Sequence, residues 1–303
     1  MEPAQLVLQY LIPGDGSGSN TVVVDLARDL SAVNRRLYRQ GYTYAVGKVT
    51  FVGPAATQQI LIAQTAGNTW MVHNAWIKGK AIWRKQRREV AELMPGIEGK
   101  WADFKVKLDD SGATYLPCVA ADAGAMASDD WDFSEVFWDD DGTERSPVFH
   151  IIGGTDVTSS IGLVQEYHIS RQRIQAADPS LDSDASDSIY AKMLHMQDEL
   201  SDDLIDDIET DGDNPPYDHD QMSGGDTVAD EPWTQEFGLA NSDAGQVGHL
   251  SGFAAECGLV KFTAGSYSNV AATLGVAVNA QMGIYVHLVP GPYRGVLAEA
   301  MGQ

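Results

Sequence analysis

The chain has little of what marks several common classes of protein. It contains only two cysteines among 303 residues, Cys118 and Cys257, and they lie far apart. A disulfide framework is therefore not expected, and two buried thiols are. No apolar run approaches the roughly 20 residues that cross a bilayer. The first residues, MEPAQLVLQY, lack the basic leader and apolar centre of a signal peptide. We expect a soluble protein with no membrane partner.

Motifs for catalysis and for cofactor binding are also missing. The glycine-rich stretch at 14–20 contains no GxGxxG that opens a helix, and no GK[ST]. No GxSxG nucleophile motif occurs. The seven histidines show neither HExxH spacing nor a zinc-binding Cys–His pattern. These absences predict a protein that is not an enzyme and needs no cofactor.

Positive charge is scarce in most of the chain, whose net charge is −23. Residues 1–107 carry 14 Lys and Arg against 8 Asp and Glu, whereas residues 108–303 carry 6 against 35. The acidic excess is greatest at 182–231, where 17 acidic residues accompany one lysine. Such asymmetry indicates surfaces with different partners. Adaptation to salty surroundings is a second explanation for the acidity.

Hydrophobic periodicity predicts about ten strands. Runs rich in β-branched and aromatic residues, bounded by turn formers, predict strands at 5–12, 21–25, 43–53, 58–64, 101–110, 147–154, 161–170, 257–264, 270–279 and 283–291. Helical spacing of apolar residues predicts helices at 26–41, 69–94 and 186–209, with Gly41 ending the first. Residues 109–146 and 221–250 are expected to be loops.

Strands and helices do not alternate regularly, which argues against a doubly wound parallel sheet. The pattern favours a mainly β fold, a jelly-roll-like antiparallel β sandwich with two or three inserted helices. We expect one domain over residues 1–303, with an acidic helix and loop insertion at about 180–250.

The first two predicted helices carry clusters of basic side chains. Contact between such faces and phosphate is independent of sequence and sensitive to salt. The candidate nucleic-acid-binding residues are Arg35, Arg36, Arg39, Lys80, Arg84, Arg87 and Arg88. A solvated helix face, or one that pairs with the acidic helix at 186–209, is the alternative interpretation.

Two acidic turns offer the oxygen ligands that calcium prefers. They are DDDGTE at 139–144 and DGDNPPYDHD at 211–220, with Asp139, Asp141, Asp211 and Asp213 as candidate ligands. Neither matches an EF-hand loop, so solvated acidic turns are the alternative. A further group of aromatic residues forms either a sugar-binding platform or a set of buried side chains; its members are Trp131, Phe133, Phe137 and Trp138.

Several segments resemble capsid proteins of small circular single-stranded DNA viruses, of the CRESS type. The likeness spreads over most of the chain, in NRRLYRQGYTYAVGKVTF (34–51), NTWMVHNAWIKGKAIWRKQ (68–86), GKWADFKVKLDD (99–110), SDSIYAKM (186–193) and GPYRGVLAEAM (291–301). It implies a structural jelly-roll protein that self-assembles into an icosahedral shell around viral single-stranded DNA. Assembly would take place inside the host cell and yield the virion, with calcium a candidate ion at subunit interfaces.

One feature departs from this family. Many such capsid proteins begin with a long Arg-rich arm, whereas this chain begins MEPAQLVLQY. Packaging charge would then come from the helices at 26–41 and 69–94, or from another component. Two other classes of function stay open at this point. They are a carbohydrate-binding or carbohydrate-active β sandwich, and an acidic phage accessory protein.

Overall fold

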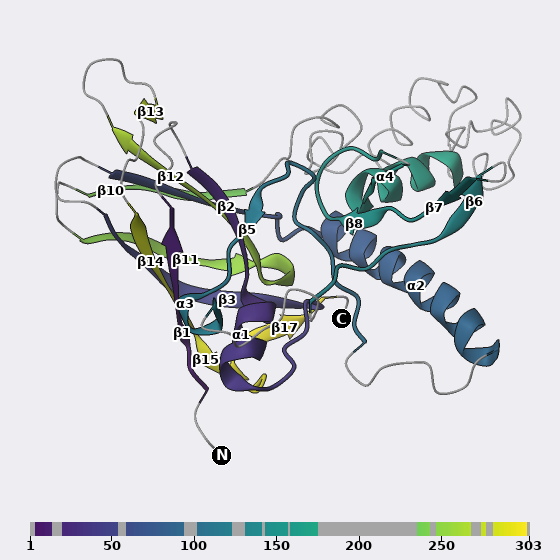
Figure 1. Cartoon of the computed structure of the whole chain (residues 1–303), viewed down its shortest axis with the longest axis horizontal. Helices are drawn as coiled ribbons and strands as arrows, with labels where there is room; N and C mark the ends of the chain where they lie inside the picture. The colour runs from purple at the N-terminus through teal and green to yellow at the C-terminus, as the bar shows by residue number, and fades with distance from the viewer. Residues whose placement is uncertain are drawn as a thin grey trace, which may run out of the picture.

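The structure is a computed structural model that describes most of the chain outside its acidic middle. The described residues are 4–13, 20–53, 59–93, 102–122, 131–140, 143–156, 158–174, 235–242, 247–267, 274–276 and 281–301. Figure 1 shows the long strands gathered on one side of the molecule and the longest helix, α2, extending away on the other. The predicted acidic helix at 186–209, and the insertion at about 180–250 up to residue 234, lie outside the described residues.

The fold is mainly β, and its two principal sheets are built mostly from antiparallel strands. The first sheet has the order β1-β14-β3-β11, and β17 also pairs with β3. Its strands are β1 (Val7–Ile12), β14 (Met282–Leu288), β3 (Tyr42–Val52), β11 (Val247–Ala255) and β17 (Ala298–Ala300). All of its pairings are antiparallel.

The second sheet has the order β10-β4-β12-β2-β5, and β13 also pairs with β12. Its strands are β10 (Gln235–Ser242), β4 (Gln59–Thr65), β12 (Leu259–Tyr267), β2 (Asn20–Asp25), β5 (Thr114–Tyr115) and β13 (Leu274–Val276). The short strand β5 runs parallel to β2, and the other pairings are antiparallel. Along the chain the long strands switch from sheet to sheet, except that β4 and β10 are neighbours in one sheet.

The remaining elements are short pairs and helices. The pairs are β15 (Pro290–Gly291) with β16 (Gly295–Val296), β6 (Trp138–Asp140) with β7 (Thr143–Arg145), and β8 (Val148–His150) with β9 (Ser160–Gly162). The helices are α1 (Leu26–Asn34), α2 (Trp70–Leu93), α3 (Val119–Asp122), α4 (Leu163–Ile174) and the 3₁₀ turn η3 (Glu256–Gly258). None of the described helices has the length and apolar character needed to cross a membrane.

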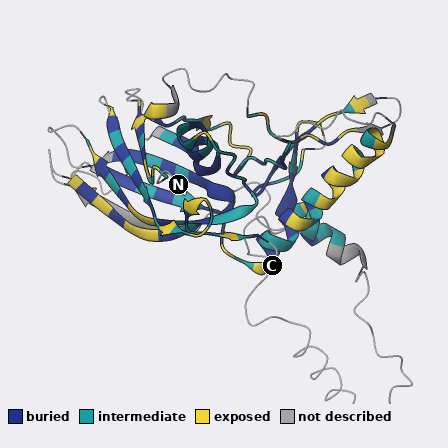
Figure 2. Cartoon of the chain, turned by 90° about the horizontal axis from the view of Figure 1, so that it is seen from below, coloured by how far each residue is buried: buried dark blue, intermediate teal, exposed yellow. Residues whose placement is uncertain are grey.

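One hydrophobic core joins the two sheets. Strand β1 alternates between exposed and buried positions, so that Leu8, Tyr10 and Ile12 all point inward. They belong to the same buried cluster as Val24 of β2 and Phe262 of β12, which come from the second sheet. Burial of such side chains contributes about 25 cal/mol per Å² of apolar surface, which makes this core the main source of stability. Figure 2 shows buried and exposed residues alternating along the strands.

A second core packs the elements that follow β4 against the second sheet. Trp76 and Trp83 of α2 form it together with Phe104, Phe149 and Leu163, and Leu259 of β12 contributes from the sheet. The Phe104 ring lies 5.8 Å from Trp76, 5.6 Å from Trp83 and 5.4 Å from Phe149, at angles typical of edge-to-face and tilted aromatic packing. The half of α2 beyond Trp83 is largely exposed, as Figure 2 shows.

Several predicted elements differ in the structure. The segment 161–170 was predicted as a strand, but Leu163–Ile174 is a helix. Its buried residues Leu163, Val164 and His168 have helical rather than alternating spacing, so the assigned period was wrong. The predicted loop at 221–250 contains β10 and the beginning of β11. The first helix ends at Asn34 with Arg35 in the left-handed conformation, and not at Gly41.

The predicted strand at 101–110 is extended but joins no sheet apart from one isolated bridge at Lys107. Phe104, Val106 and Leu108 are buried, so the predicted alternation is present. Backbone hydrogen bonds join Lys107 to Phe149 and Ile151. Side chains serve the alternate N–H groups: that of Val106 donates to Gln40 Oε1 at 2.6 Å, and that of Leu108 donates to the Tyr115 hydroxyl at 2.8 Å. Alternation of apolar and polar residues shows that one side of a segment is buried, but it does not show that the segment pairs with a neighbouring strand.

The carboxylate of Asp25 connects the two cores. It lies at the end of β2, where it caps α1 by accepting a hydrogen bond from the Arg28 N–H at 3.0 Å. Its Oδ2 accepts from Gln40 Nε2 at 2.6 Å and from Trp131 Nε1 at 2.8 Å. Asp25 is fully buried, which raises its pKa, while Arg28 and these donors act in the opposite direction.

We therefore expect Asp25→Asn to destabilise the protein by about 2–4 kcal/mol, because one carboxylate oxygen becomes an NH2 group, which cannot accept the hydrogen bonds made there. Equilibrium unfolding in urea measures the change. Asp156→Asn is the matched control, since Asp156 is exposed and its carboxylate accepts local hydrogen bonds from Thr158 and Ser159. Asp156→Asn should lower the free energy of unfolding by less than about 1 kcal/mol. Equal losses in the two variants would contradict the role given to Asp25.

A second polar contact joins α2 to the sandwich core. His73 Nε2 lies 3.1 Å from Oε2 of the buried Glu256, which also accepts from the Thr43 hydroxyl at 2.6 Å. The hydrogen bond to Glu256 raises the pKa of His73, burial opposes this shift, and the charge of Glu256 adds to it.

A raised histidine pKa stabilises the fold fully below the unfolded value near 6.5, and this stability is lost as pH rises through the folded pKa. We expect the difference in unfolding free energy between wild type and His73→Ala to be larger at pH 5.5 than at pH 8.5. Denaturant unfolding at both values tests this, with the exposed His249→Ala as control. A difference for His73→Ala that does not change with pH would rule out the linkage.

Candidate nucleic-acid interface

The predicted basic residues separate into two groups in the structure. Arg35 and Arg36 follow α1. Burial raises the pKa of the nearby Tyr38, and the charge of Arg36 partly offsets this rise. Arg39 instead lies beside α2, in one hollow with Lys80, Arg84 and Arg87. Sequence proximity on one helix therefore did not predict which side chains meet, because the chain turns between Arg36 and Arg39.

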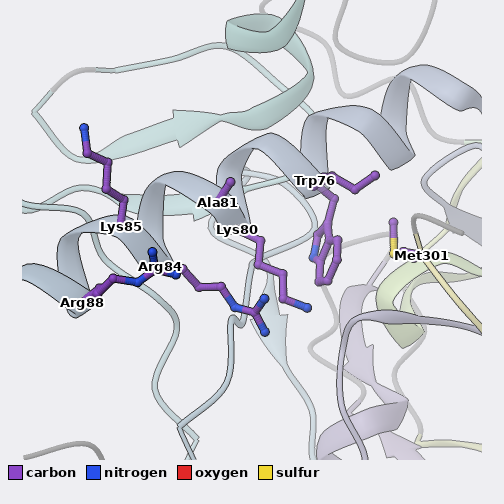
Figure 3. Close-up of a pocket in the computed structure, with 8 residues that line it drawn as sticks. Trp76, Lys80, Ala81, Arg84, Lys85, Arg88 and Met301 are labelled. Atoms are coloured by element: carbon purple, nitrogen blue, oxygen red, sulfur yellow. The ribbon is translucent and has the colours of Figure 1, made fainter. Parts of the chain in front are cut away.

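Two adjacent hollows along α2 form what we call the basic channel. The first has a volume of about 400 Å³ and is lined by Trp76, Ile77, Lys80, Ala81, Arg84, Lys85, Arg88 and Met301. The second has a volume of about 180 Å³ and is lined by Arg39, Lys80, Trp83, Arg84, Arg87, Ala102 and Asp103. They share Lys80 and Arg84. Figure 3 shows these two side chains extending from α2 on the side of the Trp76 ring.

Aromatic rings of the second core hold several of these cations in place. The ammonium of Lys80 lies 4.3 Å from the centre of the Trp76 ring, and the guanidinium of Arg87 lies 4.5 Å from that of Trp83. Both distances are within the range of cation–π attraction. Gly41 makes room for this arrangement, because a Cβ atom there would come within 2.7 Å of the Trp76 ring.

The channel has more positive than negative charge. Asp103 is its only acidic lining residue in the described part of the chain, and its Oδ1 lies 3.6 Å from Arg39. Among the described residues, no carboxylate lies within salt-bridge distance of Lys80, Arg84, Lys85, Arg87 or Arg88. Burial, and next the charge of Arg84, lower the pKa of Lys80. A bound anion would offset the repulsion between the charges of Lys80 and Arg84.

Two buried polar atoms at the channel have no hydrogen-bond partner among the described residues. They are the indole Nε1 of Trp76 and the Oδ2 of Asp103. Both atoms are buried, so neither is open to a ligand in the channel. Burial raises the pKa of Asp103, against the charges of Arg39 and Lys80.

A larger hollow of about 1100 Å³, which we call the aromatic groove, continues from the channel. It shares Trp83, Arg87, Ala102 and Asp103 with the second hollow. Its other lining residues are Gln86, Glu89, Val90, Lys105, Lys107, Asp132, Phe133, Ser134, Glu135, Phe137 and Val148. The sequence pattern did not predict this groove, and its apolar lining residue Val90 is exposed.

The aromatic residues at 131–138 do not form one platform. The Trp131 indole packs against the main core and donates to Asp25, with Lys105 4.4 Å from its ring centre. Phe133 is partly buried, 5.0 Å from the Tyr115 ring, and Phe137 is exposed. The side chain of Trp138 lies outside the described residues. Trp131 is therefore not an exposed sugar platform.

The calcium prediction remains a prediction. Asp139 lies in β6, its side chain is not described, and Asp141, Asp211 and Asp213 lie outside the described residues. Within the described part of the chain, no group of three or more His, Cys, Asp or Glu side chains is placed to hold a metal ion.

Comparisons with known proteins add no relative to this picture. No family model matches the chain, and no curated protein or solved structure is significantly similar to it. The order of the strands and the chemistry of the channel are therefore the grounds for a function.

Proposed function

We propose that this protein is a structural capsid subunit that self-assembles into an icosahedral shell and binds the viral single-stranded DNA through the basic channel. The observation that carries the proposal is the strand order. Numbered one to eight along the chain, the long strands β1, β2, β3, β4, β10, β11, β12 and β14 have the order 1-8-3-6 in the first sheet and 5-4-7-2 in the second. This is the order expected of a jelly roll, an architecture used by viral capsid proteins.

Fold alone does not decide function, because lectins and cupins use the same architecture. A second observation favours a subunit that packs against copies of itself. On the outer face of the first sheet, Leu11, Gly283, Val52 and Val247 stand in register across all four long strands. Leu11 is 40% exposed, Val52 38% and Val247 51%. Clustered exposed apolar side chains are typical of interaction surfaces.

Electrostatics agree with a shell that encloses a polyanion. The chain is strongly acidic overall, yet the channel combines six basic side chains with one carboxylate. Phosphate binding there would involve release of counterions, as in other nucleic-acid-binding proteins. In this proposal, the channel supplies positive charge for packaging.

Assembly is tested by negative-stain electron microscopy together with light scattering of the purified protein. We expect closed particles of uniform diameter whose subunit contacts each bury more than about 1,000 Å². Val247→Glu should disrupt them, because it places a charge in the apolar row. Val119→Glu is the matched control, since Val119 is an exposed valine on α3. A monomer over a wide range of salt and calcium concentrations would overturn the proposal.

Nucleic-acid binding is tested by fluorescence anisotropy with labelled single-stranded DNA over a series of salt concentrations. The double variant Arg84→Gln/Arg88→Gln should bind more weakly, with the slope of log affinity against log salt reduced by about 1.4 if each side chain contacts one phosphate. Arg35→Gln/Arg36→Gln removes the same charge from residues that do not line the channel. Equal effects of the two variants would show that only net charge matters.

A further inference from the structure

The aromatic groove differs in charge from the channel that it continues. Three basic and four acidic side chains line it, whereas the channel has one acid. Phosphates are therefore favoured in the channel and not in the groove. Arg87 and Asp103 line both the channel and the groove. A long ligand bound in the channel can therefore extend into the groove.

Phe137 gives the groove an exposed aromatic surface. It is 63% exposed, the largest exposed fraction among the large apolar side chains that the structure describes. Its backbone is nevertheless held in place by Gln86 of α2, whose Nε2 donates to the Phe137 carbonyl at 2.7 Å and whose Oε1 accepts from the Phe137 N–H at 3.2 Å. The ring of Phe133 lines the same groove, 5.8 Å from the ammonium of Lys107.

We propose that the aromatic groove binds unstacked nucleobases of a strand whose phosphates lie in the basic channel, and that a base stacks on Phe137. This inference rests on the proposed function of the channel. Every base has an aromatic face, so stacking on a phenylalanine is possible for any sequence. The groove carboxylates are acceptors for the exocyclic amino groups of cytosine, adenine or guanine. Base pairing hides these groups and faces in a duplex, which makes the groove selective for single strands.

The full-length protein is tested with two labelled oligomers of about 20 nucleotides, an oligodeoxycytidine and an abasic strand with the same number of phosphates. We expect Phe137→Ala to weaken binding of the oligodeoxycytidine roughly tenfold and to leave the abasic strand unchanged. Phe137→Trp should keep the binding that Phe137→Ala loses, because tryptophan also offers an aromatic face for stacking. Gln86→Ala should weaken binding of the oligodeoxycytidine less than Phe137→Ala does, since it keeps the aromatic ring and removes the hydrogen bonds to the Phe137 backbone.

Ile82→Ala is the control, because Ile82 is an exposed apolar residue of α2 that does not line the groove. Unchanged binding of both oligomers by Phe137→Ala would overturn the inference, while a loss in Arg84→Gln/Arg88→Gln would still support the channel. Failure of wild type to bind either oligomer would overturn both. Binding of a soluble oligosaccharide that Phe137→Ala abolishes, with no preference for the oligodeoxycytidine over the abasic strand, would assign the groove to carbohydrate instead.

Discussion

The arrangement of the molecule depends on one buried carboxylate. Asp25 ends β2, begins α1, and accepts hydrogen bonds from Gln40 and Trp131, which come from two other segments. Gln40 in turn accepts from the Val106 N–H, and thereby fixes the extended segment beside α2. A buried charge is tolerated only where donors surround it. The carboxylate therefore holds four segments at one point, where the two cores meet.

This junction also positions the candidate site. Phe104 lies two residues before Val106 and packs against Trp76 and Trp83, the rings over which Lys80 and Arg87 lie. The positions of the basic side chains thus follow from the packing of α2, and the packing of α2 follows from the extended segment. Charged groups held against aromatic rings lose less conformational freedom on binding than free surface lysines do, which favours affinity for an anion.

Much of the fold could be predicted from the sequence because the long strands of the two sheets carry strong local signals. The alternation in Val7–Ile12 and Met282–Leu288, and the helical spacing of Val72, Trp76 and Trp83, all agree with the structure. Prediction failed for two segments. Residues 163–174 form a helix because their buried residues have helical and not alternating spacing. The extended segment at 102–108 joins neither principal sheet, since side chains supply part of its hydrogen bonding.

The site could be predicted only in part, for a related reason. Charge spacing along α2 identified Lys80, Arg84, Arg87 and Arg88, because one helix brings residues at i and i+4 to one face. No local rule unites Arg39 with them, or adds Asp103, Lys105 and Lys107, since these residues are distant in the sequence and meet only through tertiary packing.

The division between channel and groove is itself a consequence of α2 lying at the edge of the second core. On one side of the helix, the described residues that line the first hollow are all basic or uncharged, so the positive charge there is unbalanced within the described part of the chain. The other side meets residues 102–107 and 132–137, whose acids balance the cations and whose rings are partly exposed. A ligand with a charged backbone and neutral aromatic side groups has the same division of chemistry. The two surfaces together match a single strand of nucleic acid better than either a simple anion or a neutral sugar, which would each be complementary to one surface alone.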